Sequence, residues 1–113
     1  MEARTVSVEE LAALLDGDGA PVVIDVRKKP DYAADPRLVP GALKRSLEEI
    51  EAWGQALPQG RPVVVYCAEG KWVGVAAADW LRAHGRPTRQ VEGGFAAWRA
   101  AGLPTEEPSR RRR

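Results

Sequence analysis

One stretch of the sequence decides the fold, and it reads RPVVVYCAEGKWVGV from Arg61 to Val75. The apolar run Val63 to Tyr66 is unbroken and rich in β-branched residues, which predicts a strand buried on both faces. After it come Cys67 and a short loop, in which Gly70 allows the backbone to turn sharply. From Trp72 onward, apolar residues recur at helical spacing. The stretch therefore predicts a strand, a tight loop and a helix, with the only cysteine of the chain at the carboxyl end of the strand.

The predicted position of Cys67 favours a reactive thiol. Ligands of open α/β sheets bind at the carboxyl ends of the strands. Backbone N–H groups of the loop and the N-terminus of the following helix both stabilise an anion, so they favour the nucleophilic thiolate over the thiol. The alternative is a small buried cysteine that only packs as a hydrophobic residue.

The rest of the chain alternates between strand and helix patterns. Segments between them carry Gly and Pro, which favour turns. This order predicts an α/β fold with a parallel central sheet of about five strands and helices on both faces. The expected strands are Arg4 to Val6, Val22 to Val26, Val63 to Tyr66 and Thr88 to Val91.

Several residues have expected structural roles in the helices. The pairs Ser7/Glu10 and Ser46/Glu49 have the spacing of capping boxes, which predicts a helix start at each serine. His84 is expected to cap the end of the helix that follows the loop, where a cation meets the helix dipole favourably. The tryptophans on apolar helical faces are expected in the core, and they are Trp53, Trp80 and Trp98.

Length and composition limit the classes of protein that the chain can be. A chain of 113 residues has room for one domain, and its net charge of +1 gives no general reason to expect nucleic acid or a membrane as partner. The chain has a single Cys, which excludes an internal disulfide. Because it also has a single His, a transition-metal site built from protein ligands is disfavoured, and we expect no cofactor. With no apolar signal segment after Met1, we expect a cytoplasmic protein in a reducing compartment.

The central stretch and several other motifs also resemble one family. Cys67, Gly70, Ala76 and Ala77 match the C-x-x-G-x-R-S loop and Ala-rich helix of rhodanese-like sulfurtransferases. In the order of the family, this loop is accompanied by a D-x-R strand end, an I-P-G-A turn, an E-G-G-x-x-x-W motif and a G-x-P close. The corresponding residues here are Asp25 to Arg27, Val39 to Ala42, Glu92 to Trp98 and Gly102 to Pro104. The resemblance covers roughly residues 5 to 105 and indicates a rhodanese-like domain over 1–105, followed by a charged tail, 106–113, that we expect to be disordered.

The resemblance implies a thiosulfate sulfurtransferase-like enzyme that works through a persulfide on Cys67. The donor would be a small sulfur compound such as thiosulfate, or a protein that bears a persulfide, and the acceptor would be thiophilic. Substrate would be bound by the loop residues Ala68, Glu69, Gly70, Lys71, Trp72 and Val73, largely through backbone N–H groups. Asp25 and Arg27 would stabilise the loop or line the site, although a purely structural ion pair is an equal alternative. The protein is expected to be a monomer or a weak dimer.

Individual side chains in the loop leave alternatives open. Lys71 is the only cation there and could attract an anionic donor, or it could be an ordinary exposed lysine that pairs with Glu69. Trp72 could form an apolar wall that suits an organic or protein-bound donor, but simple packing against the loop is the favoured interpretation. Arg110 to Arg113 could contact RNA or an acidic partner, but a solvated tail is favoured.

The loop also departs from the family pattern. Trp72 and Val73 stand where the family often has Arg and then Ser or Thr, and Leu38 stands where it commonly has His. A catalytically weak or inactive module that binds a partner or carries sulfur is therefore the alternative function. A cysteine phosphatase is disfavoured, because its C-x₅-R loop needs Arg where this chain has Val73.

Overall fold

Five parallel strands form the centre of the molecule in the computed structural model, which describes residues 4–108. The strand order is β1-β5-β4-β2-β3, so the strand that precedes Cys67 is central. The strands are β1 (Thr5–Val6), β2 (Val22–Asp25), β3 (Leu43–Lys44), β4 (Val63–Tyr66) and β5 (Thr88–Val91). The predicted α/β class and number of strands are therefore confirmed.

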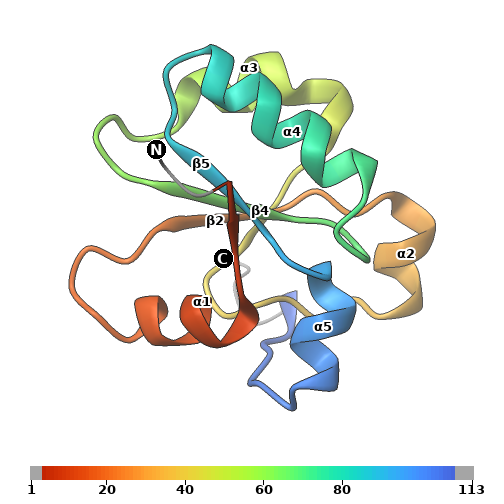
Figure 1. The fold of residues 1–113 in the computed structure, drawn as a ribbon. Helices are drawn as coiled ribbons and strands as arrows, with labels where there is room; N and C mark the ends of the chain where they lie inside the picture. Colours follow the sequence, from red (N-terminus) through yellow and green to blue (C-terminus); the bar gives the residue numbers. More distant parts are fainter. Residues whose placement is uncertain (1–3, 109–113) are drawn as a thin grey trace.

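Helices cover both faces of this sheet (Figure 1). Helices α3 (Ile50–Ala56) and α4 (Trp72–Ala83) lie on one face, and α1 (Val8–Leu15) and α5 (Gly94–Ala100) lie on the other. Helix α2 (Lys29–Ala34) lies beside the carboxyl end of the sheet. None of the helices in the described part of the chain is long and apolar enough to cross a membrane.

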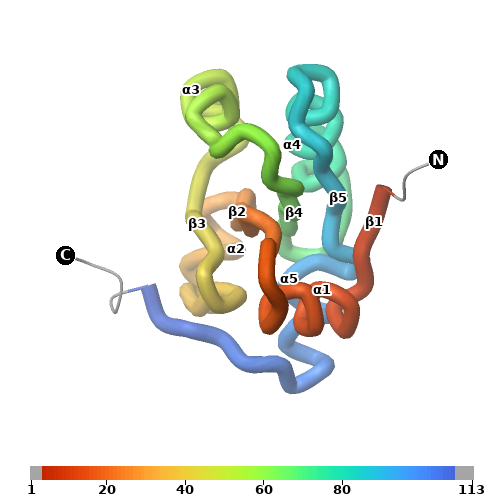
Figure 2. The backbone as a smooth tube through the Cα atoms, turned by 90° about the vertical axis from the view of Figure 1, so that its left-hand side faces the viewer, coloured from red at the N-terminus to blue at the C-terminus, as the bar shows by residue number. Residues whose placement is uncertain are grey.

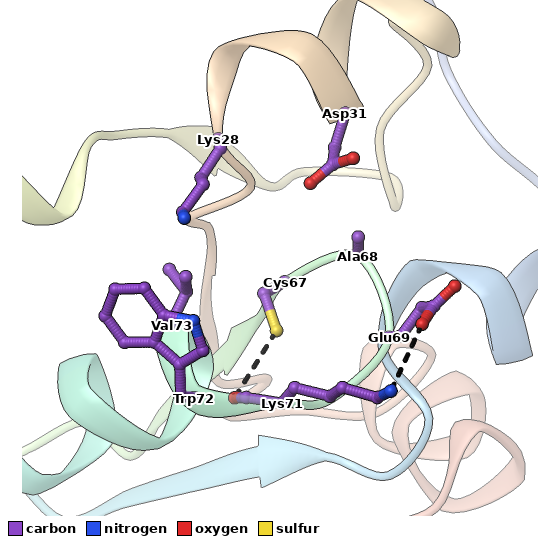
Figure 3. Close-up of a pocket in the computed structure, with 8 residues that line it drawn as sticks. All are labelled: Lys28, Asp31, Cys67, Ala68, Glu69, Lys71, Trp72 and Val73. Atoms are coloured by element: carbon purple, nitrogen blue, oxygen red, sulfur yellow. Dashed lines mark hydrogen bonds and ion pairs between the residues drawn. The ribbon is translucent and has the colours of Figure 1, made fainter.

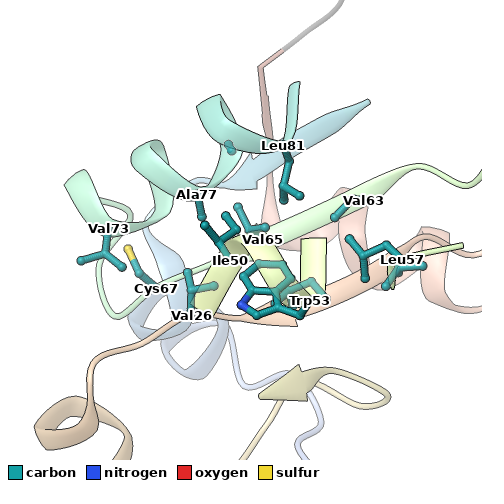
Figure 4. Close-up of a cluster of buried hydrophobic side chains, with 13 residues drawn as sticks. Val26, Ile50, Trp53, Leu57, Val63, Val65, Cys67, Val73, Ala77 and Leu81 are labelled. Carbon is teal, nitrogen blue, oxygen red and sulfur yellow. The ribbon is translucent and has the colours of Figure 1, made fainter. Parts of the chain in front are cut away.

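The position of β4 between two helical layers explains why its sequence is continuously apolar. Val63 and Val65 pack in the cluster beneath α3 and α4, whereas Val64 and Tyr66 pack in the cluster with α1 and α5. Successive side chains of a strand point to opposite faces, so a strand between two helical layers is buried throughout. Figure 4 shows the first cluster, which also contains Cys67.

The parallel register brings the carboxyl ends of the strands to one edge of the sheet. Asp25 of β2 lies opposite Tyr66 of β4, the residue before Cys67. Val91 ends β5 and leads into the turn before α5. This edge therefore carries the Cys67 loop, the start of α2 and the start of α5.

The two predicted capping boxes have different outcomes. The Ser7 hydroxyl accepts a hydrogen bond of 3.0 Å from the Glu10 N–H, as predicted, while the Glu10 carboxylate pairs with Arg89 instead of turning back. At Ser46 the prediction is wrong, because its side chain caps no helix. Residues Leu47–Glu49 there form a 3₁₀ turn before α3 begins at Ile50.

The predicted aromatic core is confirmed for two of the three tryptophans. Trp53 and Trp98 are buried, while Trp80 is half-buried and packs at the margin of the first cluster. His84 ends α4 as predicted: its Nδ1 lies 2.8 Å from the carbonyl oxygen of Trp80, and its ring stacks on that indole.

A C-terminal segment crosses the molecule to join residues before β3 (Figure 2). Glu106 exchanges two backbone hydrogen bonds with Leu38, of 2.8 and 2.9 Å, and Glu107 forms an ion pair with Arg37. Glu106 and Glu107, which the sequence analysis assigned to the tail, are therefore in contact with the domain. The remaining predicted tail, including Arg110 to Arg113, lies outside the described residues from position 109 onward.

Candidate active site

Cys67 lies at the end of β4, at the base of a pocket of about 280 Å³ (Figure 3). Its side chain is 5% exposed, and its thiol lies 3.7 Å from the carbonyl oxygen of Lys71 as a hydrogen-bond donor. From the loop and the start of α4, the pocket is lined by Cys67, Ala68, Glu69, Lys71, Trp72 and Val73. Cys67 thus packs against the core and also borders an open pocket. Its surroundings combine features of both alternatives, the buried hydrophobic cysteine and the accessible thiol.

Gly70 gives the loop its shape and does not line the pocket. Its φ of +77° is in the left-handed region that favours glycine. A Cβ atom at this position would lie 2.9 Å from the backbone nitrogen of Gly93. Gly70 is therefore required for the close approach of the loop to the segment before α5.

The start of α5 fixes the loop from below through two backbone hydrogen bonds. The Phe95 N–H donates to the carbonyl of Cys67 at 2.8 Å, and the Ala96 N–H donates to the carbonyl of Ala68 at 2.9 Å. Gly94 allows this contact, because a Cβ there would lie 2.5 Å from the Cys67 oxygen. The structural role of the E-G-G motif could not be predicted from the sequence, because it depends on two segments that meet only in the folded chain.

The N–H groups of the loop itself are left available. Within residues 4–108, no backbone N–H from residue 68 to residue 73 donates a hydrogen bond to another part of the chain. These groups follow the thiol directly and lead into the N-terminus of α4, which carries partial positive charge. The loop therefore offers several unsatisfied donors to an anion.

The two charged side chains of the loop form an exposed ion pair. The Lys71 ammonium and the Glu69 carboxylate lie 3.7 Å apart, and both side chains are mostly exposed. Figure 3 shows the Lys71 side chain extending along the loop toward Glu69 and away from the thiol. The alternative that Lys71 pairs with Glu69 is thus the observed one.

Trp72 does not pack against the loop, so the favoured interpretation of this residue is wrong. Its side chain is 61% exposed and lines the pocket. The residue after it, Val73, is buried in the core cluster, although it also borders the pocket. Trp72 is the first residue of α4, at the edge of the sheet that carries the pocket.

The opposite wall of the pocket comes from residues that the sequence analysis did not select. Lys28 precedes α2 and Asp31 lies in its first turn, and both side chains line the pocket. The Lys28 ammonium lies 4.7 Å from the centroid of the Trp72 ring. The available signal was their place just after the carboxyl end of β2, the strand that neighbours β4.

Asp25 and Arg27 do not line this pocket, in contrast to the prediction that they could line the site. They form a buried ion pair of 2.9 Å, with side chains 0% and 2% exposed. The guanidinium also donates to the carbonyls of Asp35 and Arg37, and it lies over the Phe95 ring at 4.1 Å. Because Phe95 binds the Cys67 carbonyl, this arrangement matches the alternative in which the pair stabilises the loop.

Two neighbours of this ion pair have altered acid–base properties. Burial, followed by the nearby charge of Asp25, raises the pKa of Tyr66 well above its ordinary value. Burial lowers the pKa of Lys44, although the charge of Asp25 opposes the effect. Tyr66 is therefore a neutral hydrogen-bonding group, whose hydroxyl accepts the Val39 N–H at 3.2 Å.

Comparison with known proteins identifies relatives of this chain. It is 34% identical over 82 residues to a tRNA sulfurtransferase of Desulfurococcus amylolyticus, and 32% identical over 91 residues to an HTH-type transcriptional regulator of Mycobacterium tuberculosis. These matches cover 73% and 79% of this chain, but the chain spans only 16% and 39% of the two relatives.

A solved structure and the sequence model of a protein family are also similar to this chain. The crystal structure of a thiosulfate sulfurtransferase from Pseudomonas aeruginosa superposes with a TM-score of 0.77 at 30% identity, over 94% of this chain and 20% of that one. The sequence model of the rhodanese-like domain matches residues 7–101, which include the Cys67 loop and the α5 motif. The chain therefore belongs to the family of rhodanese-like domains.

Proposed function

We propose that this protein is a sulfurtransferase in which Cys67 carries the transferred sulfur as a persulfide. The observation that supports it most directly is the combination of a thiol at the base of an open pocket with a run of backbone N–H groups that have no acceptor within residues 4–108. Such donors stabilise a thiolate and, after transfer, the terminal sulfur of a persulfide. The sulfurtransferase names of two relatives agree with this proposal.

The reaction proceeds in two displacements at sulfur. The Cys67 thiolate attacks the outer sulfur of a donor such as thiosulfate, an S–S bond forms, and the S–S bond of the donor breaks. Sulfite leaves with the bonding electron pair. A thiophilic acceptor then attacks the outer sulfur of the persulfide, and the Cys67 thiolate leaves. No second cysteine is needed, because the acceptor itself resolves the intermediate.

The donor is a small sulfur compound or a protein that bears a persulfide. The pocket is open to solvent beside the exposed Trp72 ring, so either type of donor can reach the thiol. A thiolate nucleophile needs surroundings that keep it reduced, and for this reason we place the reaction in the cytoplasm.

The test is the intact mass of the protein after incubation with thiosulfate, and separately with a persulfide-loaded cysteine desulfurase. We expect the gain of one sulfur atom, reversed by cyanide and absent in Cys67→Ser. If neither donor adds sulfur to Cys67, the proposal is wrong.

The second candidate function is a rhodanese-like module that binds a partner or carries sulfur without turning over thiosulfate. The exposed Trp72 ring favours it, because exposed aromatic residues are common at recognition surfaces. The similarity to a transcriptional regulator agrees with a domain that serves a larger assembly. A persulfide formed only from the desulfurase would favour the carrier, and turnover of thiosulfate would favour the enzyme.

A further inference from the structure

A cation beside the Cys67 pocket would attract an anionic donor more strongly than the backbone N–H groups alone, and the one lysine of the loop, Lys71, is paired with Glu69. Position 72, the first residue after Lys71, is the uncharged Trp72. Lys71 is held in its ion pair with Glu69 and extends away from the thiol (Figure 3). Arg27 is buried and fully bonded to Asp25 and to backbone carbonyls outside the pocket.

Lys28 meets the requirement from the opposite wall. Figure 3 shows its side chain directed across the mouth of the pocket toward Trp72 and Val73. Among residues 4–108, no carboxylate lies within ion-pair distance of the Lys28 ammonium, although Asp31 lines the same wall. Its charge is therefore not neutralised by a direct partner.

The Trp72 ring attracts the Lys28 ammonium. An ammonium 4.7 Å from an indole centroid is within the range of a favourable cation–π contact. The ring attracts the ammonium without occupying it as a carboxylate would, so its N–H groups stay available to an anionic ligand. Trp72 thus favours the presence of a cation from a different segment, Lys28, at the pocket.

We propose that Lys28, positioned by Trp72, binds the anionic group of the sulfur donor and makes the Cys67 pocket selective for anions. This inference rests on the proposed function for its ligand, which is an anionic sulfur compound such as thiosulfate. During transfer the same charge stabilises the leaving sulfite. Lys28 and Lys71 are matched in number by Asp31 and Glu69 around the pocket, so the attraction depends on the position of Lys28 and not on the net charge of the lining.

A pair of alkylating reagents tests this charge without requiring sulfur transfer. Iodoacetate and iodoacetamide alkylate a thiolate alike and have similar shapes, but only iodoacetate is negatively charged. The ratio of their rate constants at Cys67 therefore reports the attraction of the pocket for an anion. A single lysine near a partly solvated site contributes about threefold to tenfold to such a ratio.

We expect Lys28→Gln to lower the iodoacetate-to-iodoacetamide ratio by this factor and to raise the KM for thiosulfate. Lys71→Gln is the matched control and should change the ratio by less than about twofold, because the Lys71 ammonium pairs with Glu69 and extends away from the thiol. Lys28→Arg and Trp72→Phe should retain most of the ratio, since each keeps the cation or the ring, whereas Trp72→Ala should lower it. Thermal unfolding of each variant checks that the fold is retained.

The outcomes separate the two proposals. An unchanged ratio in Lys28→Gln, or an equal loss in Lys71→Gln, would overturn the role of Lys28 whatever the protein does with sulfur. A lowered ratio in a protein that accepts sulfur from no donor would support the anion site and refute the sulfurtransferase.

Discussion

At the scale of single residues, the edge of the sheet depends on buried polar side chains that do not line the Cys67 pocket. The Asp25–Arg27 pair is fully buried, and Arg27 satisfies its remaining donors with two backbone carbonyls. Buried charges persist only when paired and hydrogen-bonded, so these residues fix the local structure. Tyr66 lies next to them, and its ring stacks on Phe95 at 5.6 Å.

The raised pKa of Tyr66 predicts a loss of stability at high pH. Above pH about 10 the unfolded chain loses the phenolic proton while the folded chain keeps it, so the folded state binds more protons. The free energy of unfolding should then fall by up to about 1.4 kcal/mol per pH unit from this group. Urea unfolding at pH about 8 and about 11 measures the effect.

The substitution Tyr66→Phe isolates this contribution. The variant should lose about 1–2 kcal/mol at the lower pH, because the Val39 N–H loses its acceptor, but it should decline less as the pH rises. Lys44, whose pKa is lowered, acts in the opposite sense in both proteins. Tyr32→Phe is the control and should decline like the unsubstituted protein; equal slopes in all three would contradict the assignment.

At the scale of elements, the site is the meeting of two segments, the β4–α4 loop and the N-terminus of α5. The loop provides the thiol, and α5 provides the N–H groups that bind the carbonyls of Cys67 and Ala68. Because the contact is between backbones, it depends on glycines and not on side chains. Of these glycines, Gly94 has the least room for a Cβ atom.

The substitution Gly94→Ala should therefore displace the loop. A Cβ at Gly94 would lie 2.5 Å from the Cys67 oxygen and 2.6 Å from the Gly70 nitrogen, at a φ of +62°. Gly102→Ala is the matched control, with a φ of +72° and no atom within 4 Å of the added Cβ. The control should cost about 1–2 kcal/mol from the backbone conformation alone.

Gly94→Ala should cost at least twice as much and should also abolish persulfide formation on Cys67. Chemical denaturation and intact mass after incubation with a sulfur donor measure the two effects. Equal costs and unchanged sulfur uptake would show that the α5 contact does not position the thiol.

The elements also show what the sequence could and could not predict. The apolar run Val63 to Tyr66 and the position of Cys67 were predictable, because both depend on local pattern. Strand β3 was missed because it has only two half-buried residues, and Ser46 was misassigned because a 3₁₀ turn precedes the helix. The roles of Lys28 and Gly94 depend on segments that meet only in the folded chain.

At the scale of the whole molecule, the C-terminal segment packs against the layer formed by α1 and α5. The Trp98 indole N–H donates to the Pro104 carbonyl at 2.7 Å, and Arg37 contacts both Thr105 and Glu107. Together with the two hydrogen bonds between Leu38 and Glu106, these contacts join the end of the domain to the segment before β3.

A chain that ends at Gly102 should be less stable than one that ends at Pro108. It loses the Leu38–Glu106 bonds and the acceptor of the buried Trp98 indole, which together contribute about 3 kcal/mol at about 1 kcal/mol each. Such a loss is a large share of the stability of a small domain. Thermal and urea unfolding of the two chains compare them; equal stability would show that residues 103–108 do not stabilise the domain.

The contact between α5 and the Cys67 loop also sets the order in which the protein can mature during synthesis. Cys67 leaves the ribosome before Phe95 and Ala96, whose N–H groups bind the carbonyls of its loop. In the described sheet β1 is an edge strand that pairs with β5, so β1 also remains unpaired until β5 has been made. A nascent chain therefore carries an unpositioned thiol until its last helix has been made. The thiol that we propose as the nucleophile therefore reaches its final surroundings only after α5 has been made.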